Sequence, residues 1–448
     1  MPSASPPVLS RVFALVDVSN FYVACERVFR PDLRTRPVVV LSNNDGCIVS
    51  RSQEVKDAGI AMGAPHFKTR RQLRAMGAEV FSSNYELYGD FSRRLMETLG
   101  TFTPDVEPYS IDEAFLVFTT PRPRDRDPVR LAALAREIQA RVAQWTSLPV
   151  RVSFARTKTL CKVGSELARS RGGTINLVGR DSREMEDLLA QVPVGDVWGV
   201  GRATARKLDA RGAKTARDLR DLSDAWVRKV LHTVGMRTVY ELRGVSCLPL
   251  ERAPRPRHTI MRSRSFGQAV TDPTSMREAL ATHASAACRT LRDEGLAAQA
   301  VQIFYRTGKH ERDAERSVSL GTPLPSPTSS TAEVVRATRQ LLAHSWASRD
   351  GTGRPFRYKK AGVMLLDLCP DDAQTHLFAP RQPEQHALYA AMDALNRRFG
   401  RRGTPAVALA STHLRRSGTA ARWRTTREHA SPAYTTRLDS LPSVVFAA

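Results

Sequence analysis

Apolar runs and helically spaced apolar positions alternate along the first part of the chain. Residues 12–18 are apolar except for one acid, Asp17, near the end of the run, and this pattern predicts a buried strand. A helix is expected to begin near Phe21. Two more apolar runs flank a turn sequence at 43–46, so residues 37–50 predict a β-hairpin, with helical segments from there to about residue 100.

The same alternation continues over the next part of the chain. Residues 106–118 predict a pair of strands, with Asp112 and Glu113 between their apolar runs. Apolar residues recur at helical spacing over 131–145, and 149–155 predicts another strand. Strands that alternate with helices in this way indicate an α+β fold class, and the length of the chain indicates several domains.

The second half of the chain has a different pattern. Residues 180–245 predict a small all-helical region with a Gly-x-Gly turn. Beyond it we expect a strand at 264–269, a helix at 275–292 and a strand at 300–306. A Pro/Ser/Thr-rich break at 322–331 precedes another helix, and a last strand covers 360–368. From Pro370 onward the periodicity is weak and arginine is frequent, so no element is predicted there.

Charge is the strongest signal in the composition. The 448 residues carry a formal net charge of +23, which favours a polyanionic partner, nucleic acid first; an arginine-rich surface without such a partner is the alternative. The six cysteines include no Cys-x-x-Cys pair, which argues against a zinc knuckle or a disulfide scaffold and for a reducing cytoplasm. The sequence has no signal-peptide pattern and no 18-residue apolar stretch, so no contact with a membrane is expected.

Acids inside apolar strands are the candidate chemistry. Asp17 ends one predicted strand, and the pair Asp112 and Glu113 interrupts another. Phosphoryl transfer to a sugar hydroxyl uses two divalent ions about 3.5–4 Å apart, and hard cations prefer carboxylate oxygens. The alternative is a solvated strand end or a salt-bridged pair, because such acids are costly to bury without a positive partner.

Longer motifs around these acids resemble those of the Y-family translesion DNA polymerases. Val-Asp-Val-Ser-Asn-Phe-Tyr at 16–22, Tyr-Ser-Ile-Asp-Glu-Ala-Phe at 109–115 and Ala-Arg-Thr-Lys-Thr-Leu-Cys-Lys at 155–162 carry the resemblance. Within the family the chain is most similar to the UmuC branch, the catalytic subunits of bacterial DNA polymerase V. Four further motifs support that branch, at 41–47, 81–88, 196–202 and 431–437.

The resemblance implies a right-hand polymerase followed by a little finger domain and a C-terminal tail. The implied parts are a palm (11–20 and 86–178), fingers (21–85), a helical thumb with a helix-hairpin-helix (179–246), a linker (247–258), a little finger (259–369) and a tail (370–448).

The resemblance also implies a two-Mg²⁺ site. In it Asp17 and Asp112 bridge both ions, Glu113 holds the ion at the primer 3′-hydroxyl, and the Val18 carbonyl completes the ion on the triphosphate side. Tyr22, five residues after Asp17, stands where the family has its steric gate against ribonucleotides.

The expected triphosphate contacts come from several segments. The helix start offers free amides to a phosphate, and basic residues add charge. The candidates for dNTP binding are Asn20, Phe21, Tyr22, Ser50, Arg51, Lys56 and Arg169. Gln53 and Lys56 stand where the family has a Tyr and an Arg, so this part of the site departs from the family pattern.

The expected DNA contacts lie outside the palm. Glycines of a helix-hairpin-helix let backbone amides approach a phosphate without sequence readout. The candidates are Gly199, Gly201, Arg202, Arg206 and Lys207 in the thumb and Arg262 and Arg264 in the little finger. In addition, Gln374-Thr-His-Leu-Phe fits the pattern of peptides that dock on the bacterial sliding clamp, with Leu377 and Phe378 filling an apolar pocket.

The predicted function is therefore error-prone translesion DNA synthesis in the SOS response, with primer-template DNA and dNTPs as substrates. Residues 21–85 leave no room for large fingers, and no second acid cluster suggests a proofreading exonuclease. The resemblance further implies a UmuD-like dimer and RecA as partners and a cytoplasmic, nucleoid-associated location. Two alternatives remain open: a non-catalytic, polymerase-like mutasome subunit, and another palm-type nucleotidyl transferase such as a nucleotide cyclase.

Overall fold

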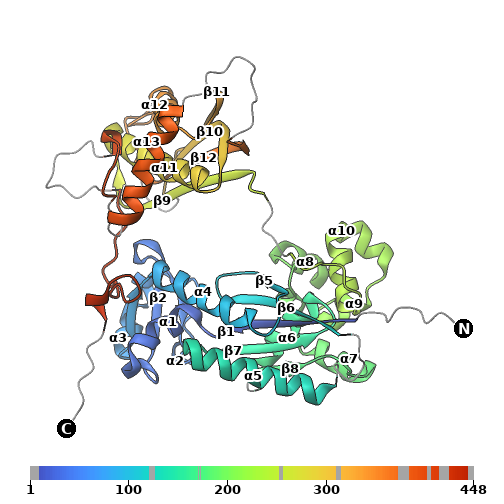
Figure 1. The fold of residues 1–448 in the computed structure, drawn as a ribbon. Helices are drawn as coiled ribbons and strands as arrows, with labels where there is room; N and C mark the ends of the chain where they lie inside the picture. The colour runs from blue at the N-terminus through green and yellow to red at the C-terminus, as the bar shows by residue number, and fades with distance from the viewer. Residues whose placement is uncertain are drawn as a thin grey trace, which may run out of the picture. The chain divides into compact units, whose positions relative to one another are not determined.

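The computed structural model describes residues 10–120, 127–169, 171, 173–251, 256–308, 314–371, 383–400, 405–412 and 423–441 (Figure 1). The chain divides into two compact units. The first comprises Met1–Ser42, Cys47–Pro254 and His429–Ala448, and the second comprises Asn43–Gly46 and Arg255–Glu428. Each unit has its own hydrophobic core and is described separately.

A five-stranded sheet forms the centre of the first unit. Its strands, in spatial order, are β5 (Val106–Pro108), β6 (Glu113–Thr120), β1 (Ser10–Val18), β7 (Val150–Ala155) and β8 (Thr174–Asn176). The central strand β1 pairs antiparallel with β6 and β7. Its apolar run is continuous because both faces of the sheet are covered by helices, which confirms the predicted strand over 12–18.

Alternation along β1 decides which helix each side chain meets. Phe13 and Leu15 pack with residues of α6 (Lys158–Ala168), whereas Val12 and Val16 pack with residues of α5 (Pro128–Thr146) on the opposite face. Successive side chains of a strand point to opposite faces. Asp17 therefore lies on the α6 side of the sheet.

A smaller sheet follows β1 in the chain and has the order β3 (Ile48–Arg51), β2 (Val38–Leu41), β4 (Glu79–Ser82). The antiparallel pairing of β2 with β3 confirms the predicted hairpin. The prediction of helices alone up to residue 100 is wrong, because β4 adds to β2 in parallel. The helices of this region are α1 (Phe21–Phe29), α2 (Gln53–Asp57), α3 (His66–Ala75) and α4 (Tyr85–Gly100).

The predicted all-helical region is present and joins the five-stranded sheet through buried polar groups. Its helices are α7 (Ser182–Ala190), α8 (Arg202–Ala210), α9 (Ala216–Asp221) and α10 (Asp224–Leu242). The fully buried carboxylate of Glu241 on α10 accepts from the backbone amide of Thr159 on α6 at 3.0 Å. Close by, the buried ammonium of Lys158 bonds the carboxylate of Glu107 on β5 at 2.5 Å. A buried charge that is paired in this way is costly to separate from its partner, so these bonds stabilise the packing of α6 against its neighbours.

The second unit is an antiparallel sheet in the order β11 (Ser317–Thr328), β10 (Leu296–Thr307), β12 (Tyr358–Pro370), β9 (Thr259–Val270). Helix α11 (Pro273–Asp293) packs against β9 and β12, and α12 (Thr331–Ser345) packs against β10 and β11. The predicted strands and helices of this region are therefore confirmed, with longer bounds than expected.

The predicted break over 322–331 is wrong, because most of it belongs to strand β11. Pro323, Pro325 and Pro327 alternate along this strand, which lies at an edge of the sheet. Proline has no N–H to donate, but alternate residues of an edge strand point their N–H groups away from the sheet. The prolines therefore cost no sheet hydrogen bond and protect the open edge from a further strand.

A helix that the sequence pattern did not predict, α13 (Pro383–Phe399), packs on α11. Arg292 of α11 bonds the buried carboxylate of Asp393 at 2.7 Å, and its guanidinium lies 4.7 Å from the centre of the Tyr389 ring. The start of the C-terminal region is thus part of the second unit. None of the described helices combines the length and hydrophobicity that a membrane-spanning segment requires.

Candidate active site

Strand register brings Asp17 next to two other charged side chains. Asp17 lies directly opposite Glu113 of β6 on one side and opposite Arg151 of β7 on the other. Side chains directly opposite in an antiparallel pair share a face, with Cβ atoms roughly 4.5–5.5 Å apart. Two acids and a base therefore stand in a row at this end of the sheet.

Two side chains hold the carboxylate of Asp17. A guanidinium nitrogen of Arg151 lies 2.6 Å from its Oδ2, and the Ser165 hydroxyl donates to the same oxygen at 3.1 Å. Ser165 belongs to α6, which covers this face of the sheet. The Asp17 side chain is 18% exposed, so the carboxylate remains accessible from solvent.

The carboxylate of Glu113 is also held by a side chain of α6, which stands about one turn before Ser165. The ammonium of Lys162 lies 2.6 Å from its Oε2. Burial raises the pKa of Glu113; Lys162 opposes this rise, and the negative charges of Asp17 and Asp112 add to it. Asp17 and Asp112 thus lie close enough to disfavour the charged form of Glu113, which is a condition that a bound cation relieves.

Asp112 completes the acidic group. Its backbone carbonyl accepts from the amide of Val18 at 2.9 Å, and its carboxylate accepts from the Ser110 hydroxyl at 2.6 Å. In the described part of the chain no three His, Cys, Asp or Glu side chains converge into a ready metal cluster. The donor set nevertheless fits hard divalent cations, since it consists of carboxylates at neighbouring strand ends.

Tyr22 lies beside these acids in an aromatic stack. Its ring stacks on that of Tyr88 of α4, with centroids 4.2 Å apart and planes 13° apart, and the edge of Tyr85 approaches at 6.1 Å. The pKa of Tyr22 is raised by burial first and then by the charges of Tyr85 and Asp112. The position of this ring is therefore fixed by α4 as well as by its own helix.

The predicted triphosphate residues include a group of cations. The pKa of Lys56 is lowered, first by burial and then by the charges of Arg169, Arg151 and Arg51. Three arginines thus lie around Lys56; of these, Arg51 also donates to the carbonyl of Ile60, and Arg169 pairs with Glu166 at 3.1 Å. Like charges that crowd together favour the approach of a polyanion.

The structure also places Ser50 and Asn20, two other residues predicted to bind the triphosphate, and Gln53. The Ser50 hydroxyl is buried and accepts from the backbone amide of Val23 at 3.4 Å. Asn20 occupies the N-cap position of α1 in the left-handed conformation, without a side-chain capping bond. Gln53, at the position where the family has a tyrosine, is exposed and bonds Asp57 at 2.7 Å.

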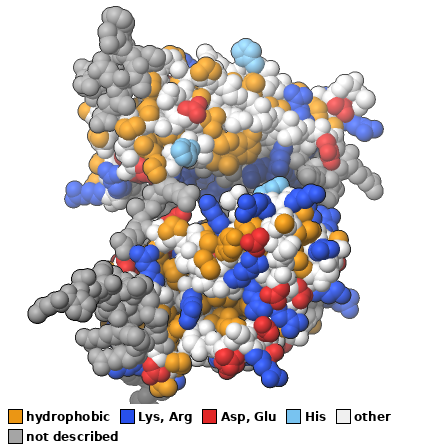
Figure 2. All heavy atoms as spheres, turned by 90° about the vertical axis from the view of Figure 1, so that its right-hand side faces the viewer, with side chains coloured by type: hydrophobic (Ala, Val, Ile, Leu, Met, Phe, Trp, Pro, Cys, Tyr) orange, Lys and Arg blue, Asp and Glu red, His pale blue; other side chains and the backbone are white. Residues whose placement is uncertain are grey.

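The predicted helix-hairpin-helix has the expected local geometry. Gly199 has a φ of 91°, a conformation that favours glycine, and Gly201 stands at the N-cap of α8. The side chains of Arg202, Arg206 and Lys207 on that helix are all exposed. In the view of Figure 2, Lys and Arg side chains recur on the surface of each unit, which suits a polyanionic partner.

In the second unit, Arg262 and Arg264 alternate along the edge strand β9, so both point to the same face, and both are exposed. Arg262 donates to the hydroxyl of Thr290 at 2.5 Å. The predicted clamp-binding peptide, Gln374 to Phe378, lies outside the described residues.

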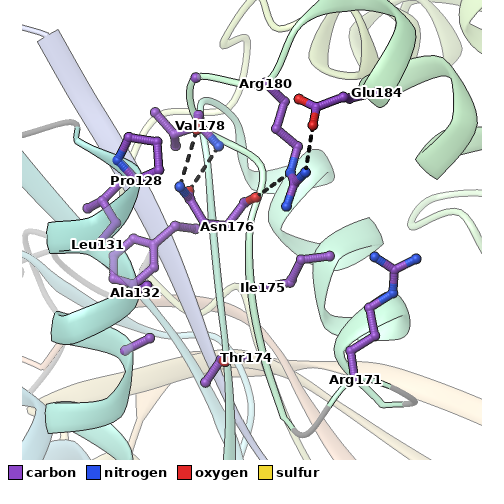
Figure 3. Close-up of a pocket in the computed structure, with 13 residues that line it drawn as sticks. Pro128, Leu131, Ala132, Arg171, Thr174, Ile175, Asn176, Val178, Arg180 and Glu184 are labelled. Atoms are coloured by element: carbon purple, nitrogen blue, oxygen red, sulfur yellow. Dashed lines mark hydrogen bonds and ion pairs between the residues drawn. The ribbon is translucent and has the colours of Figure 1, made fainter.

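A pocket of about 420 Å³ lies elsewhere, between α5 and β8 (Figure 3). Pro128 and Leu131 line one side, and Arg180, which bonds the Asn176 carbonyl and Glu184, lines the other (Figure 3). The predicted triad of acids does not line it. The acids stand instead at or next to the ends of β1 and β6.

The sequence pattern did not predict that the acids bond Arg151, Lys162 and Ser165. Arg151 was a basic residue in a predicted strand, and Lys162 and Ser165 are three apart on a helix. That helical spacing places two side chains on one face and was the available signal. The pairing of Arg151 with Asp17 depends on strand register, which the sequence pattern does not reveal.

Known family models match most of the chain. The impB/mucB/samB family model matches residues 16–166, and the model of that family's C-terminal domain matches 257–377. The HHH motif model of the IMS family matches 182–213, and a domain of unknown function (DUF4113) matches 386–444. The chain belongs to the impB/mucB/samB family.

Individual relatives sharpen the assignment. The protein UmuC of Salmonella typhimurium is 42% identical over 438 residues, which are 96% of this chain and 99% of the relative. A DNA polymerase IV of Alkalilimnicola ehrlichii is 30% identical over 80% of this chain and 96% of its own length. These findings confirm the predicted Y-family resemblance and the UmuC branch.

A solved structure confirms the fold class. A Y-family DNA polymerase chimera of Dbh and Dpo4 superposes with a TM-score of 0.61, at 19% identity, over 80% of this chain and 98% of the chimera. The right-hand polymerase fold with an added C-terminal domain is therefore established, whereas the residue boundaries predicted for its parts stay predictions.

Proposed function

We propose that the chain is an error-prone translesion DNA polymerase that uses two Mg²⁺ ions to add dNTPs to a primer 3′-end. Its family and fold are those of DNA-directed DNA polymerases. The observation that carries the catalytic assignment is the register of β1 and β6, which sets Asp17 opposite Glu113 and next to Asp112. Without that register, a non-catalytic mutasome subunit would fit the fold equally well.

In this proposal the acids and the Val18 carbonyl hold the ions. Bound there, two divalent cations supply activation of the primer hydroxyl and neutralisation of the leaving pyrophosphate. Arg151 and Ser165 orient Asp17, and Lys162 orients Glu113, so the carboxylates keep their places before substrate arrives.

The residues around the acids position the nucleotide. Tyr22 presents its ring to the sugar and excludes a 2′-hydroxyl. Lys56, Arg51, Arg151 and Arg169 attract the triphosphate, so neighbouring guanidinium groups compensate for the arginine that Lys56 replaces. The amides at the start of α1 add donors to a phosphate oxygen. Ser50 supports α1 from behind rather than touching the nucleotide.

Partners complete the proposal. The thumb hairpin and the exposed arginines of β9 grip the DNA backbone without reading sequence. Gln374, Leu377 and Phe378 dock on the sliding clamp. A UmuD-like dimer and RecA are the remaining proposed partners, in keeping with the UmuC branch and a nucleoid-associated, cytoplasmic role.

Primer extension with Mg²⁺ tests the function. Asp112→Asn keeps the shape of the side chain but removes its charge, and we expect kcat to fall by about 1,000-fold or more, because a metal-binding oxygen loses its charge. Glu137→Gln is the matched control, since Glu137 is an exposed acid on α5. Extension by Asp112→Asn at the wild-type rate would refute the two-metal site and favour the non-catalytic subunit. Release of a cyclised nucleotide from a single NTP would favour the cyclase instead.

A further inference from the structure

The last described segment of the chain returns to the catalytic unit. His429 to Tyr434 belongs to the first unit, although the residues before it, 255–428, belong to the second. Ser431 and Tyr434 are 6% and 7% exposed there. The domain of unknown function that matches 386–444 covers this segment, and its description assigns it no role.

The segment first extends the small sheet. Ser82 is the last residue of β4, which is an edge strand, and it forms a parallel bridge with Ala430. The Ser82 amide donates to the His429 carbonyl at 2.8 Å, and the His429 amide donates to the Ser82 hydroxyl at 3.0 Å. An edge strand offers unpaired backbone groups, and the segment fills them.

Beyond this bridge, the segment enters a buried hydrogen-bond network. The Asn84 amide donates to the Ser431 hydroxyl at 2.9 Å, and that hydroxyl donates to Oε1 of Glu26 at 3.1 Å. Glu26 lies on α1 and is fully buried. The Tyr88 hydroxyl donates to the same Oε1 at 2.8 Å.

Two ring contacts complete the arrangement. Tyr434 stacks on Phe29 at the end of α1, with centroids 4.4 Å apart and planes 6° apart. On the other side of the network, Tyr88 carries the stacked ring of Tyr22. The C-terminal segment thus contacts the end of α1 directly, at Phe29. It is connected to Tyr22, at the start of α1, through Glu26 and Tyr88.

We propose that His429–Tyr434 is a positioning element of the nucleotide site, which acts through Glu26 and Tyr88 to fix the ring of Tyr22 and so sets discrimination between deoxyribo- and ribonucleotides. Ser431 and Tyr434 touch no substrate in this role and are positioning residues. The inference rests on the proposed role of Tyr22 as the steric gate.

The experiment compares full-length variants in single-nucleotide insertion. The readout is the ratio of kcat/KM for a dNTP to that for the matching rNTP. We expect Ser431→Ala and Tyr434→Ala each to lower this ratio by about 3- to 10-fold, because a sub-ångström shift of a gate ring changes a steric contact steeply. Tyr434→Phe keeps the ring and should keep the ratio. Thr436→Ala, at an exposed position two residues beyond the segment, is the matched control.

The ratio separates positioning from stability. A loss of folded protein lowers both kcat/KM values equally and leaves the ratio unchanged, so unchanged ratios in Ser431→Ala and Tyr434→Ala would overturn the inference. Tyr22→Ala serves as the reference. If it relaxes discrimination and the double variant Tyr22→Ala/Ser431→Ala relaxes it no further, the two residues act on one contact, as proposed. If Tyr22→Ala itself leaves the ratio intact, the steric gate is refuted and the inference with it.

Discussion

The candidate site has an acidic side, where the carboxylates of Asp17 and Glu113 are each paired with a basic side chain. On its basic side, the ammonium of Lys56 stands next to other positive charges. Asp17 bonds Arg151, and Glu113 bonds Lys162. Lys56, in contrast, has its pKa lowered by burial and by three neighbouring arginines. The carboxylates of the acidic side are thus paired, whereas Lys56 is surrounded by like charges, two of which, Arg151 and Arg169, also pair with Asp17 and Glu166.

This difference assigns separate tasks to the two sides. In the proposed function, the bonds to Arg151 and Lys162 keep the carboxylates in place before a metal ion binds. Crowded cations are destabilised by their own repulsion, and a triphosphate relieves it. Arg151 belongs to both groups, since it bonds Asp17 and also depresses the pKa of Lys56. A substitution of Arg151 therefore tests whether the acidic and the basic side depend on each other.

Among the changes that test this comparison, Arg151→Gln is expected to have the largest effect. Asp17 loses the partner that orients it, and the basic group loses one charge, so kcat/KM for dNTP insertion should fall by about 10- to 100-fold. Arg151→Lys should lose less because the charge remains. Arg136→Gln, an exposed position on α5, is the control. Wild-type kinetics in Arg151→Gln would mean that the two sides are independent.

A smaller effect is expected from Lys56→Ala. The triphosphate loses one cation while the acids keep their bonds, so KM for dNTP should rise by about 10-fold with little change in kcat. Lys68→Ala removes an exposed lysine of the nearby helix α3 and should change neither constant. A fall in kcat at constant KM would instead place Lys56 on the acidic side.

The smallest effect is a pH dependence of dNTP binding. Because burial and the neighbouring arginines lower the pKa of Lys56, its charge is lost at a lower pH than that of an ordinary lysine. KM for dNTP should therefore rise by about 2- to 3-fold on the alkaline side, as the proton leaves. Lys56→Arg keeps its charge at all these pH values and should flatten the profile. An identical rise in this variant would assign the titration to another group.

Local patterns predicted the elements that carry the acids, because an apolar run with one acid near its end fits a buried strand better than a surface helix or a loop. The ends of β1 and β6 were expected close to where they lie, and so was the start of α1 at Phe21. The strand pair and the family motifs together pointed to Asp17, Asp112 and Glu113 from the sequence alone.

Contacts between residues far apart in the sequence could not be predicted from local patterns. The bond between Asp17 and Arg151 joins residues far apart in sequence and depends on register. Strand β11 was taken for a break, because its three prolines are compatible with a strand only at a sheet edge. The motif at 431–437 supported the family branch, but it did not indicate that Ser431 bonds Glu26, which lies at the other end of the chain.

The return of the chain at His429 makes residues 255–428 an insertion whose two ends are both attached to the catalytic unit. A domain on a single tether explores the whole volume that its linker allows, but a domain on two tethers is confined to the overlap of two such volumes. In the proposed polymerase, this double attachment raises the effective concentration of the second unit around DNA that the first unit binds. The noncovalent contacts of the returning segment with Ser82 and Phe29 thus close the chain into a loop.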